Sequence, residues 1–140
     1  MVRRGVGGVP LDTDAARESV RERRDLLDTV SACADAVTAD WDSDAISDSE
    51  RITGPLRALL SEAGVLDTLP VVLADAVDAA GGSLEAQPVA APPYVVVTSR
   101  GPLLRATLGD DRLLVRLDCF RVTDDGYERR DGVDVTVSLA

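Results

Sequence analysis

The chain has 140 residues, of which 45% are hydrophobic and only 3% aromatic, and it carries a formal net charge of −10. This length is typical of a single domain, whose core must be built from Leu, Val and Ala. An acidic chain repels phosphates, which argues against non-specific binding to nucleic acids and to anionic membranes. No stretch approaches a membrane span, and the N-terminus lacks the apolar run of a signal peptide. We therefore expect a cytoplasmic protein.

The types of charged residue in the chain are also unusual. All 15 basic residues are arginine, Asp outnumbers Glu by 19 to 6, and lysine, histidine and asparagine are absent. This whole-chain composition resembles that of small acidic proteins of extremely halophilic archaea. The resemblance implies adaptation to a cytoplasm of molar salt and identifies no functional family. A GC-rich actinobacterial origin also explains arginine without lysine, but it explains the excess of aspartate less well.

The order of patterns along the chain predicts a flexible tail followed by one α+β domain. Residues 1–10 are rich in glycine and end at a proline, as mobile termini often do. The domain is expected to cover residues 11–140. Its helical half spans 11–81, a proline-rich connector spans 82–93, and a β half spans 94–140.

Three helices are predicted in the helical half. Apolar residues recur at steps of three and four over residues 12–41, which indicates one long helix. Arg23 interrupts this apolar seam, and three roles stay open: its stem covers apolar surface, it pairs with a carboxylate, or it marks a site. Shorter helices are expected at 50–63 and from about residue 67 to 80, and together they form a helical hairpin.

The link between the first two helices, residues 40–50, begins Asp-x-Asp-x-Asp, as calcium-binding EF-hand loops do. Such loops need Gly at position six for a sharp turn and Glu at position twelve for two ligand oxygens. This chain has Ala45 and Arg51 at those positions. We therefore expect a solvated acidic loop and no metal site.

The β half predicts a four- or five-stranded antiparallel meander with the helices packed on one face. A last strand is expected from Val133 to Leu139, and residues 127–130 form either a separate short strand or part of it. A turn at Asp110 and Asp111 would set the register of the central hairpin. That register pairs inward residues as Leu108 with Leu113, Ala106 with Val115 and Leu104 with Leu117, joined by Val95, Val97 and Cys119.

The same register places Arg105 directly opposite Arg116 on the outer face of the sheet. Like charges in cross-strand contact are destabilising unless another group lies between them. Paired guanidiniums bind oxyanions through two parallel hydrogen bonds, so the pair suggests an anion site. The alternative is that Asp118 and helix carboxylates, or solvent, neutralise the pair. The speculative ligand-binding residues are Arg105, Arg116, Arg121, Tyr94 and Thr98, although a β-bulge near Phe120 would change the face of Arg121.

The outer face is also more apolar than a solvated face should be. An exposed apolar face is an interaction surface, which suggests a protein partner or a second copy of the chain in a homo-dimer. The speculative interface residues are Val96, Leu103, Leu114 and Phe120.

Signatures of catalysis are missing from the sequence. Without histidine there is no His-based triad and no typical zinc site. Cys33 and Cys119 have neither metal-ligand spacing nor an activating base, so we expect buried, reduced thiols, no cofactor and no catalytic residue. The leading prediction is a non-enzymatic protein-interaction or binding module of a halophilic cytoplasm. The alternative is a protein or enzyme that takes a small anionic ligand on the arginine-bearing face.

Overall fold

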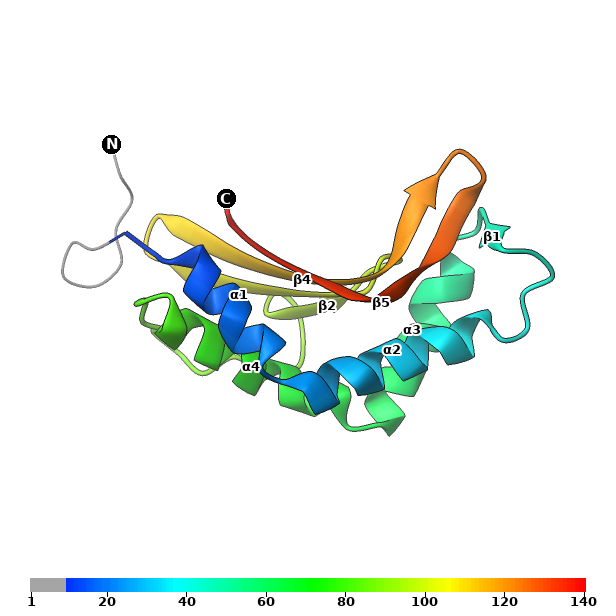
Figure 1. Cartoon of the computed structure of the whole chain (residues 1–140). Helices are drawn as coiled ribbons and strands as arrows, with labels where there is room; N and C mark the ends of the chain where they lie inside the picture. Colours follow the sequence, from blue (N-terminus) through cyan, green and yellow to red (C-terminus); the bar gives the residue numbers. More distant parts are fainter. Residues whose placement is uncertain (1–9) are drawn as a thin grey trace.

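The computed structural model of the chain describes residues 10–140, so the predicted tail lies outside the described residues apart from Pro10. The described part is an α+β fold in which helices precede most of an antiparallel sheet (Figure 1). Its elements are α1 (Thr13–Arg21), α2 (Arg24–Thr38), β1 (Ala45–Ile46), α3 (Glu50–Glu62), α4 (Val65–Ala79), β2 (Val95–Val97), β3 (Pro102–Leu108), β4 (Asp111–Thr123) and β5 (Gly126–Leu139).

The sheet has five strands in the order β1-β5-β4-β3-β2. The predicted meander is therefore present as β2 to β5. The fifth strand comes from the acidic link, where Ala45 and Ile46 pair with Glu128 and Tyr127. Residues 127–130 belong to β5 and do not form a strand of their own. Figure 1 shows all four helices on one face of the curved sheet.

The prediction of one long first helix is wrong, because the chain breaks between α1 and α2. Arg23 leaves the helical conformation and its guanidinium forms an ion pair with Asp75 of α4. Of the three roles considered for Arg23, pairing with a carboxylate is therefore the one observed. The break divides the buried seam into Ala16 and Val20 on α1 and Val30 and Ala34 on α2. Two shorter helices can follow a curved sheet more closely than one straight helix.

The helical hairpin is present, but its second helix begins earlier than expected. Gly64 ends α3 in the left-handed conformation, with φ of 76°, and α4 starts at the next residue. Glycine adopts this conformation without the steric cost that a side chain adds. The apolar face of α4 is buried as predicted, at Val72, Leu73, Ala76, Val77 and Ala80.

The inner face of the sheet forms the core with these helices. The predicted inward residues of the first three strands are buried: Val95, Val97, Leu104, Ala106, Leu108, Leu113, Val115, Leu117 and Cys119. Their alternation with less buried residues along β3 and β4 is the pattern of a sheet covered on one face.

The predicted pairing of β3 with β4 is wrong by two residues. The two-residue turn is Gly109-Asp110, so Leu108 lies opposite Asp111. Gly109 takes a positive φ of 65°, as tight hairpin turns require, and the turn therefore starts one residue earlier than expected. Because the slip is an even number, every side chain keeps its predicted face.

A β-bulge in β4 moves Phe120 to the inner side, so its predicted place on the outer face is wrong. The N–H groups of Cys119 and Phe120 both donate to the Arg100 carbonyl, at 2.6 and 3.0 Å. Two consecutive residues are therefore buried and the alternation is lost. Phe120 is 1% exposed, and its ring lies 5.9 Å from that of Trp41.

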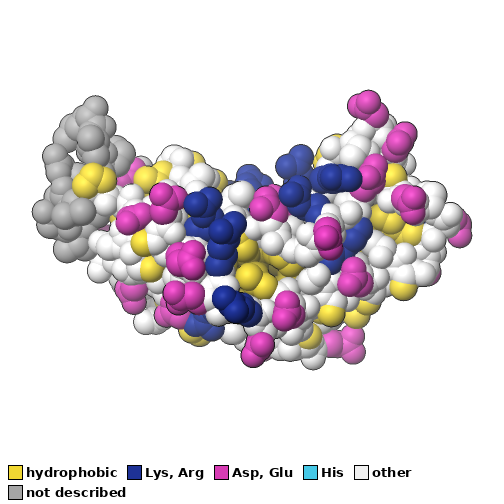
Figure 2. All heavy atoms as spheres, in the orientation of Figure 1, with side chains coloured by type: hydrophobic (Ala, Val, Ile, Leu, Met, Phe, Trp, Pro, Cys, Tyr) yellow, Lys and Arg dark blue, Asp and Glu magenta, His cyan; other side chains and the backbone are white. Residues whose placement is uncertain are grey.

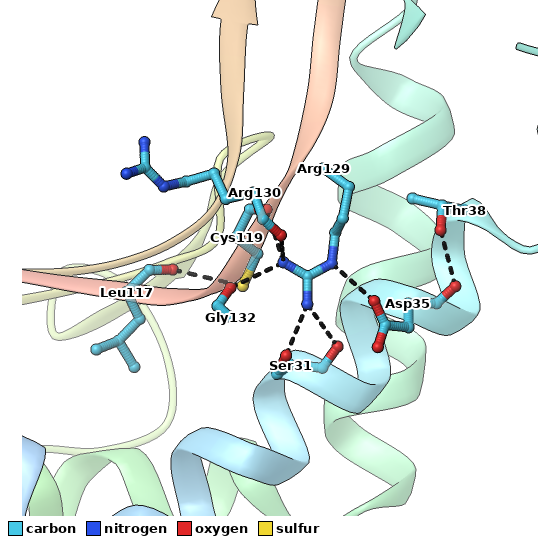
Figure 3. A network of polar contacts seen from close by, with 8 residues as sticks. All are labelled: Ser31, Asp35, Thr38, Leu117, Cys119, Arg129, Arg130 and Gly132. Carbon is cyan, nitrogen blue, oxygen red and sulfur yellow. Dashed lines mark hydrogen bonds and ion pairs between the residues drawn. The ribbon is translucent and has the colours of Figure 1, made fainter. Parts of the chain in front are cut away.

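On β5, the four residues 130–133 are skipped in the pairing at the same point. Arg129 holds this irregularity in place (Figure 3). Its Nη1 donates to the carbonyls of Cys119, Arg130 and Gly132, and its Nη2 donates to the carbonyl and hydroxyl of Ser31. Its Nε donates to Asp35 of α2 at 3.0 Å. One side chain thus joins both strands of the bulge to a helix.

Candidate functional site

The outer face of the sheet is the candidate site because none of the described helices lies on it (Figure 1). Figure 1 shows the helices on the opposite face, and the sheet curves away from them at the β4–β5 tip. In the same orientation, Figure 2 shows the upper outline hollowed between the two ends of the molecule, with arginine side chains beside the hollow.

The two arginines singled out by the sequence lie on this face, but they are not directly opposed. Arg105 of β3 faces Leu114 of β4, and Leu103 of β3 faces Arg116 of β4. Arginine and leucine therefore alternate on both strands, and the two guanidiniums are diagonal neighbours. Diagonal side chains start about 7–8 Å apart, so the repulsion expected from direct opposition is relieved.

Arg105 lies in a small hollow on this face. The hollow has a volume of about 240 Å³ and is lined by Leu84, Glu85, Ala86, Pro93, Tyr94, Arg105, Thr107 and Gly109. Tyr94 is its direct neighbour, since the Arg105 N–H donates to the Tyr94 carbonyl at 2.9 Å. The Nε of Arg105 is buried and has no hydrogen-bond partner among residues 10–140. A buried donor without an acceptor costs about 1–3 kcal/mol, and more when it is charged, so this position favours an acceptor.

Arg116 has a different environment, because acidic groups accompany it. Burial raises the pKa of the Asp118 carboxyl, and the nearby guanidiniums of Arg116 and Arg100 partly oppose this rise. Asp134 also faces Asp118, and it forms an ion pair of 3.7 Å with Arg130. The Arg116 end of the face is thus a mixed cluster of both signs. In the hollow of Arg105, Glu85 is the single acidic residue among the described lining residues.

The outer face nevertheless carries an excess of positive charge. It presents five arginines and three carboxylates in and around β3, β4 and β5: Arg100, Arg105, Arg112, Arg116, Arg130, Glu85, Asp118 and Asp134. Five positive and three negative charges give a local balance of +2 on a chain whose formal net charge is −10. The rest of the chain therefore carries more net negative charge than the chain as a whole.

Three other predicted ligand residues take different positions. Tyr94 lines the hollow with Arg105. The Thr98 hydroxyl is used in the β2–β3 turn, where it donates to the Gly101 carbonyl at 2.7 Å and accepts from two backbone N–H groups. Arg121 lies beyond the bulge, faces Glu128 and forms an ion pair with it at 3.4 Å. The structure therefore does not bring Arg121 together with Arg105.

Three of the four predicted interface residues remain on the outer face, at Val96, Leu103 and Leu114. All are half-buried by their neighbours on the sheet. Leu103 and Leu114 lie opposite Arg116 and Arg105, and Val96 lies opposite Leu103. The open face therefore offers apolar contact area as well as charge. Sequence reasoning missed Arg100, Arg130 and Glu85, because a turn, a bulge and an irregular connector place them there.

The two cysteines are buried thiols whose pKa values lie above the ordinary range. Burial raises the pKa of Cys119 to about 12, and it also raises the pKa of Cys33. Both cysteines are free and buried, as predicted. Among residues 10–140 no cluster of three or more His, Cys, Asp or Glu could hold a metal ion. In the same range no helix is both long and apolar enough to cross a membrane.

Comparison with known proteins gives one match. A family model described as "Domain of unknown function (DUF7988)" matches residues 14–140. No curated protein and no solved structure matches the chain.

Proposed function

The chain belongs to the DUF7988 family, a family of unknown function, and from its geometry we propose a non-enzymatic module that binds an acidic protein segment on its open sheet face. The observation that carries the proposal is Arg105, which lines the hollow and whose buried Nε lacks an acceptor among the described residues. A carboxylate is the acceptor whose charge and planar shape match a guanidinium.

The size of the hollow favours a side chain over a larger free ligand. Pockets for drug-sized molecules span about 300–1,000 Å³. The hollow at Arg105 measures about 240 Å³, which suits one carboxylate side chain of a longer partner. Val96, Leu103 and Leu114 beside it would contact apolar residues of the same partner.

The charge balance argues for an acidic partner and against face-to-face packing of two copies. A symmetric contact of this face with itself would bring two sets of arginines together. The composition points to a cytoplasm of molar salt, where the Debye length is about 3 Å and only contacts at short range keep their strength. A guanidinium in a partly desolvated hollow is such a contact.

The test is binding of a labelled peptide of alternating Glu and Leu residues in molar KCl, followed by fluorescence anisotropy. Arg105→Ala should weaken binding at least about tenfold, as expected for loss of a charged hydrogen-bonded pair. Arg121→Ala removes an arginine from the distant hairpin tip and is the matched control. If both variants bind as the unchanged chain does, the proposal is wrong. If free acetate or succinate competes with the peptide at equal concentration, the site is one for small anions, as in the alternative function.

A further inference from the structure

The edge of the sheet at β5 offers a second surface that is independent of the arginine-bearing face. In the strand order, β5 has β4 on one side and only the two-residue β1 on the other. β1 pairs with residues 127 and 128 alone. The stretch from Val133 to Leu139 therefore lies on the edge of the sheet, with α1 and α2 beneath the strand (Figure 1).

The hydrogen-bond pattern shows which backbone groups point outward. Arg112 and Ala140 exchange two hydrogen bonds, at 3.2 and 2.9 Å. Because such pairs alternate along antiparallel strands, Ser138, Thr136 and Asp134 also bond to β4. The N–H and C=O groups of residues 133, 135, 137 and 139 then point away from the sheet. No backbone hydrogen bond to these groups occurs within residues 10–140.

Beyond the irregularity at residues 130–133, this edge lacks the features that normally keep edge strands apart. Natural edges carry prolines, lysines or inward-pointing charges, or they are very short. The opposite edge, β2, fits that rule, with three residues that follow Pro92 and Pro93. The β5 edge has seven residues without proline or lysine, and its inward side chains are all apolar: Val133, Val135, Val137 and Leu139. Leu139 is 38% exposed.

We propose that β5 pairs with β5 of a second copy of this chain, antiparallel and centred on Thr136, so that two sheets join into one. This register keeps all seven residues in the pairing. It places Val135 opposite Val137 and Val133 opposite Leu139 on the inner side. The outward groups of these four residues then bond to each other across the two-fold axis.

Charge supports the same register. On the outer side, Asp134 lies opposite Ser138 of the other copy, and Thr136 lies opposite Thr136 of the other copy. The pairing thus avoids contact between like charges. A register centred one residue earlier or later would pair fewer of the seven residues from Val133 to Leu139. The arginine-bearing faces of the two copies become continuous, so the dimer would present a doubled binding face without covering either half.

The test uses Thr136, whose side chain lies on the axis and faces Arg116 within one chain. Thr136→Asp gains an opposite charge from Arg116 in the monomer but meets a second Asp across the axis. Thr136→Asn has the same shape without the charge and is the matched control. Sedimentation in molar KCl should give a dimer for the unchanged chain and for Asn, and at least about a tenfold higher dimer dissociation constant for Asp.

Two further measurements distinguish a dimer that forms through the β5 edge from one that forms through another surface. Val137→Pro removes an N–H that points outward, which an edge strand tolerates, and it should leave a folded monomer. In hydrogen exchange, the amides of Val135 and Val137 should be protected in the unchanged chain and exchange faster in the Asp variant. A monomer at every concentration, or a dimer that neither variant weakens, would overturn the proposal. Peptide binding per chain should be the same in the Val137→Pro monomer, because Val137 lies on the inner side of the sheet, so the two proposals can fail separately.

Discussion

Arg129 of β5 donates a hydrogen bond of 3.0 Å from Nε to Oδ1 of Asp35 on α2, 94 residues earlier in the chain. Its other nitrogens bond to four carbonyls and one hydroxyl from the bulge and from α2. The Arg129 side chain is only 16% exposed. It therefore fixes the angle between the tip of the β4–β5 hairpin and the helical layer.

We predict that Arg129→Lys lowers the free energy of unfolding by about 2–4 kcal/mol, because lysine keeps the charge but leaves several buried carbonyls without a donor. Urea unfolding at fixed KCl concentration measures the change. Arg121→Lys is the control, since that side chain is 59% exposed and an exposed ion pair contributes at most about 1 kcal/mol. Equal effects of the two substitutions would show that the Arg129 network contributes little.

Gly101 should be the least replaceable glycine among those described. A Cβ there would lie 2.0 Å from the Leu117 carbonyl oxygen, and φ is +143°. We expect Gly101→Ala to cost more than about 3 kcal/mol, because strain and a backbone clash add up. Gly109→Ala is the matched control: φ is +65° there and no atom lies within 4 Å. It should cost about 1–2 kcal/mol. Thermal unfolding of the two variants under one buffer condition compares them.

Asp118 should make stability depend on pH. Its pKa is raised in the folded chain, chiefly by burial, so the folded state binds a proton more readily than the unfolded state. The free energy of unfolding then falls as pH rises from about 4, the usual pKa of Asp, through the raised value. Asp118→Asn should be more stable than the unchanged chain at neutral pH, and the difference should vanish below about pH 4.

The control for this prediction is Asp124→Asn, because Asp124 is exposed at the tip of the hairpin. Urea midpoints measured across the pH range for both variants give the comparison. A stability difference for Asp118→Asn that grows as the pH falls would have the opposite sign and would contradict it.

The thiols should resist modification while the chain is folded. With a pKa of about 12 for Cys119 against an ordinary value of 9.0, its thiolate fraction falls about a thousandfold. A disulfide reagent at mild alkaline pH should modify Cys119 at least about a hundredfold more slowly in the native chain than in urea. Rapid modification without loss of structure would show that the β4 bulge opens readily.

Much of the sheet could be predicted because its pattern has a period of two. The inner residues of β3 and β4 were identified despite the wrong turn, since a slip of two residues leaves each side chain on its face. Gly109 indicates the observed turn, but the two aspartates that follow it favour a turn one residue later. Arg23, a charged residue within the apolar seam, was the one sign in the sequence of the break between α1 and α2.

The bulge could not be predicted in the same way. Neither Cys119 nor Phe120 is a glycine or proline, so no local residue marks the loss of alternation. The bulge depends on Arg129, whose partners Ser31 and Asp35 come from a distant helix. For the same reason, the predicted site residues Arg121 and Phe120 lie away from the candidate site. Arg105 and Tyr94, which precede the bulge, lie together.

The tilted contact between the rings of Trp41 and Phe120 makes intrinsic tryptophan fluorescence a probe of this part of the chain. Trp41 is the chain's single tryptophan, and its ring lies 5.9 Å from the residue that follows the bulge. Tryptophan emission therefore arises at one known place, between the end of α2 and the bulged strand. A change in that emission at constant helix content would record movement of the β4–β5 tip alone. Movement of the hairpin tip can then be followed without attaching a dye to the chain.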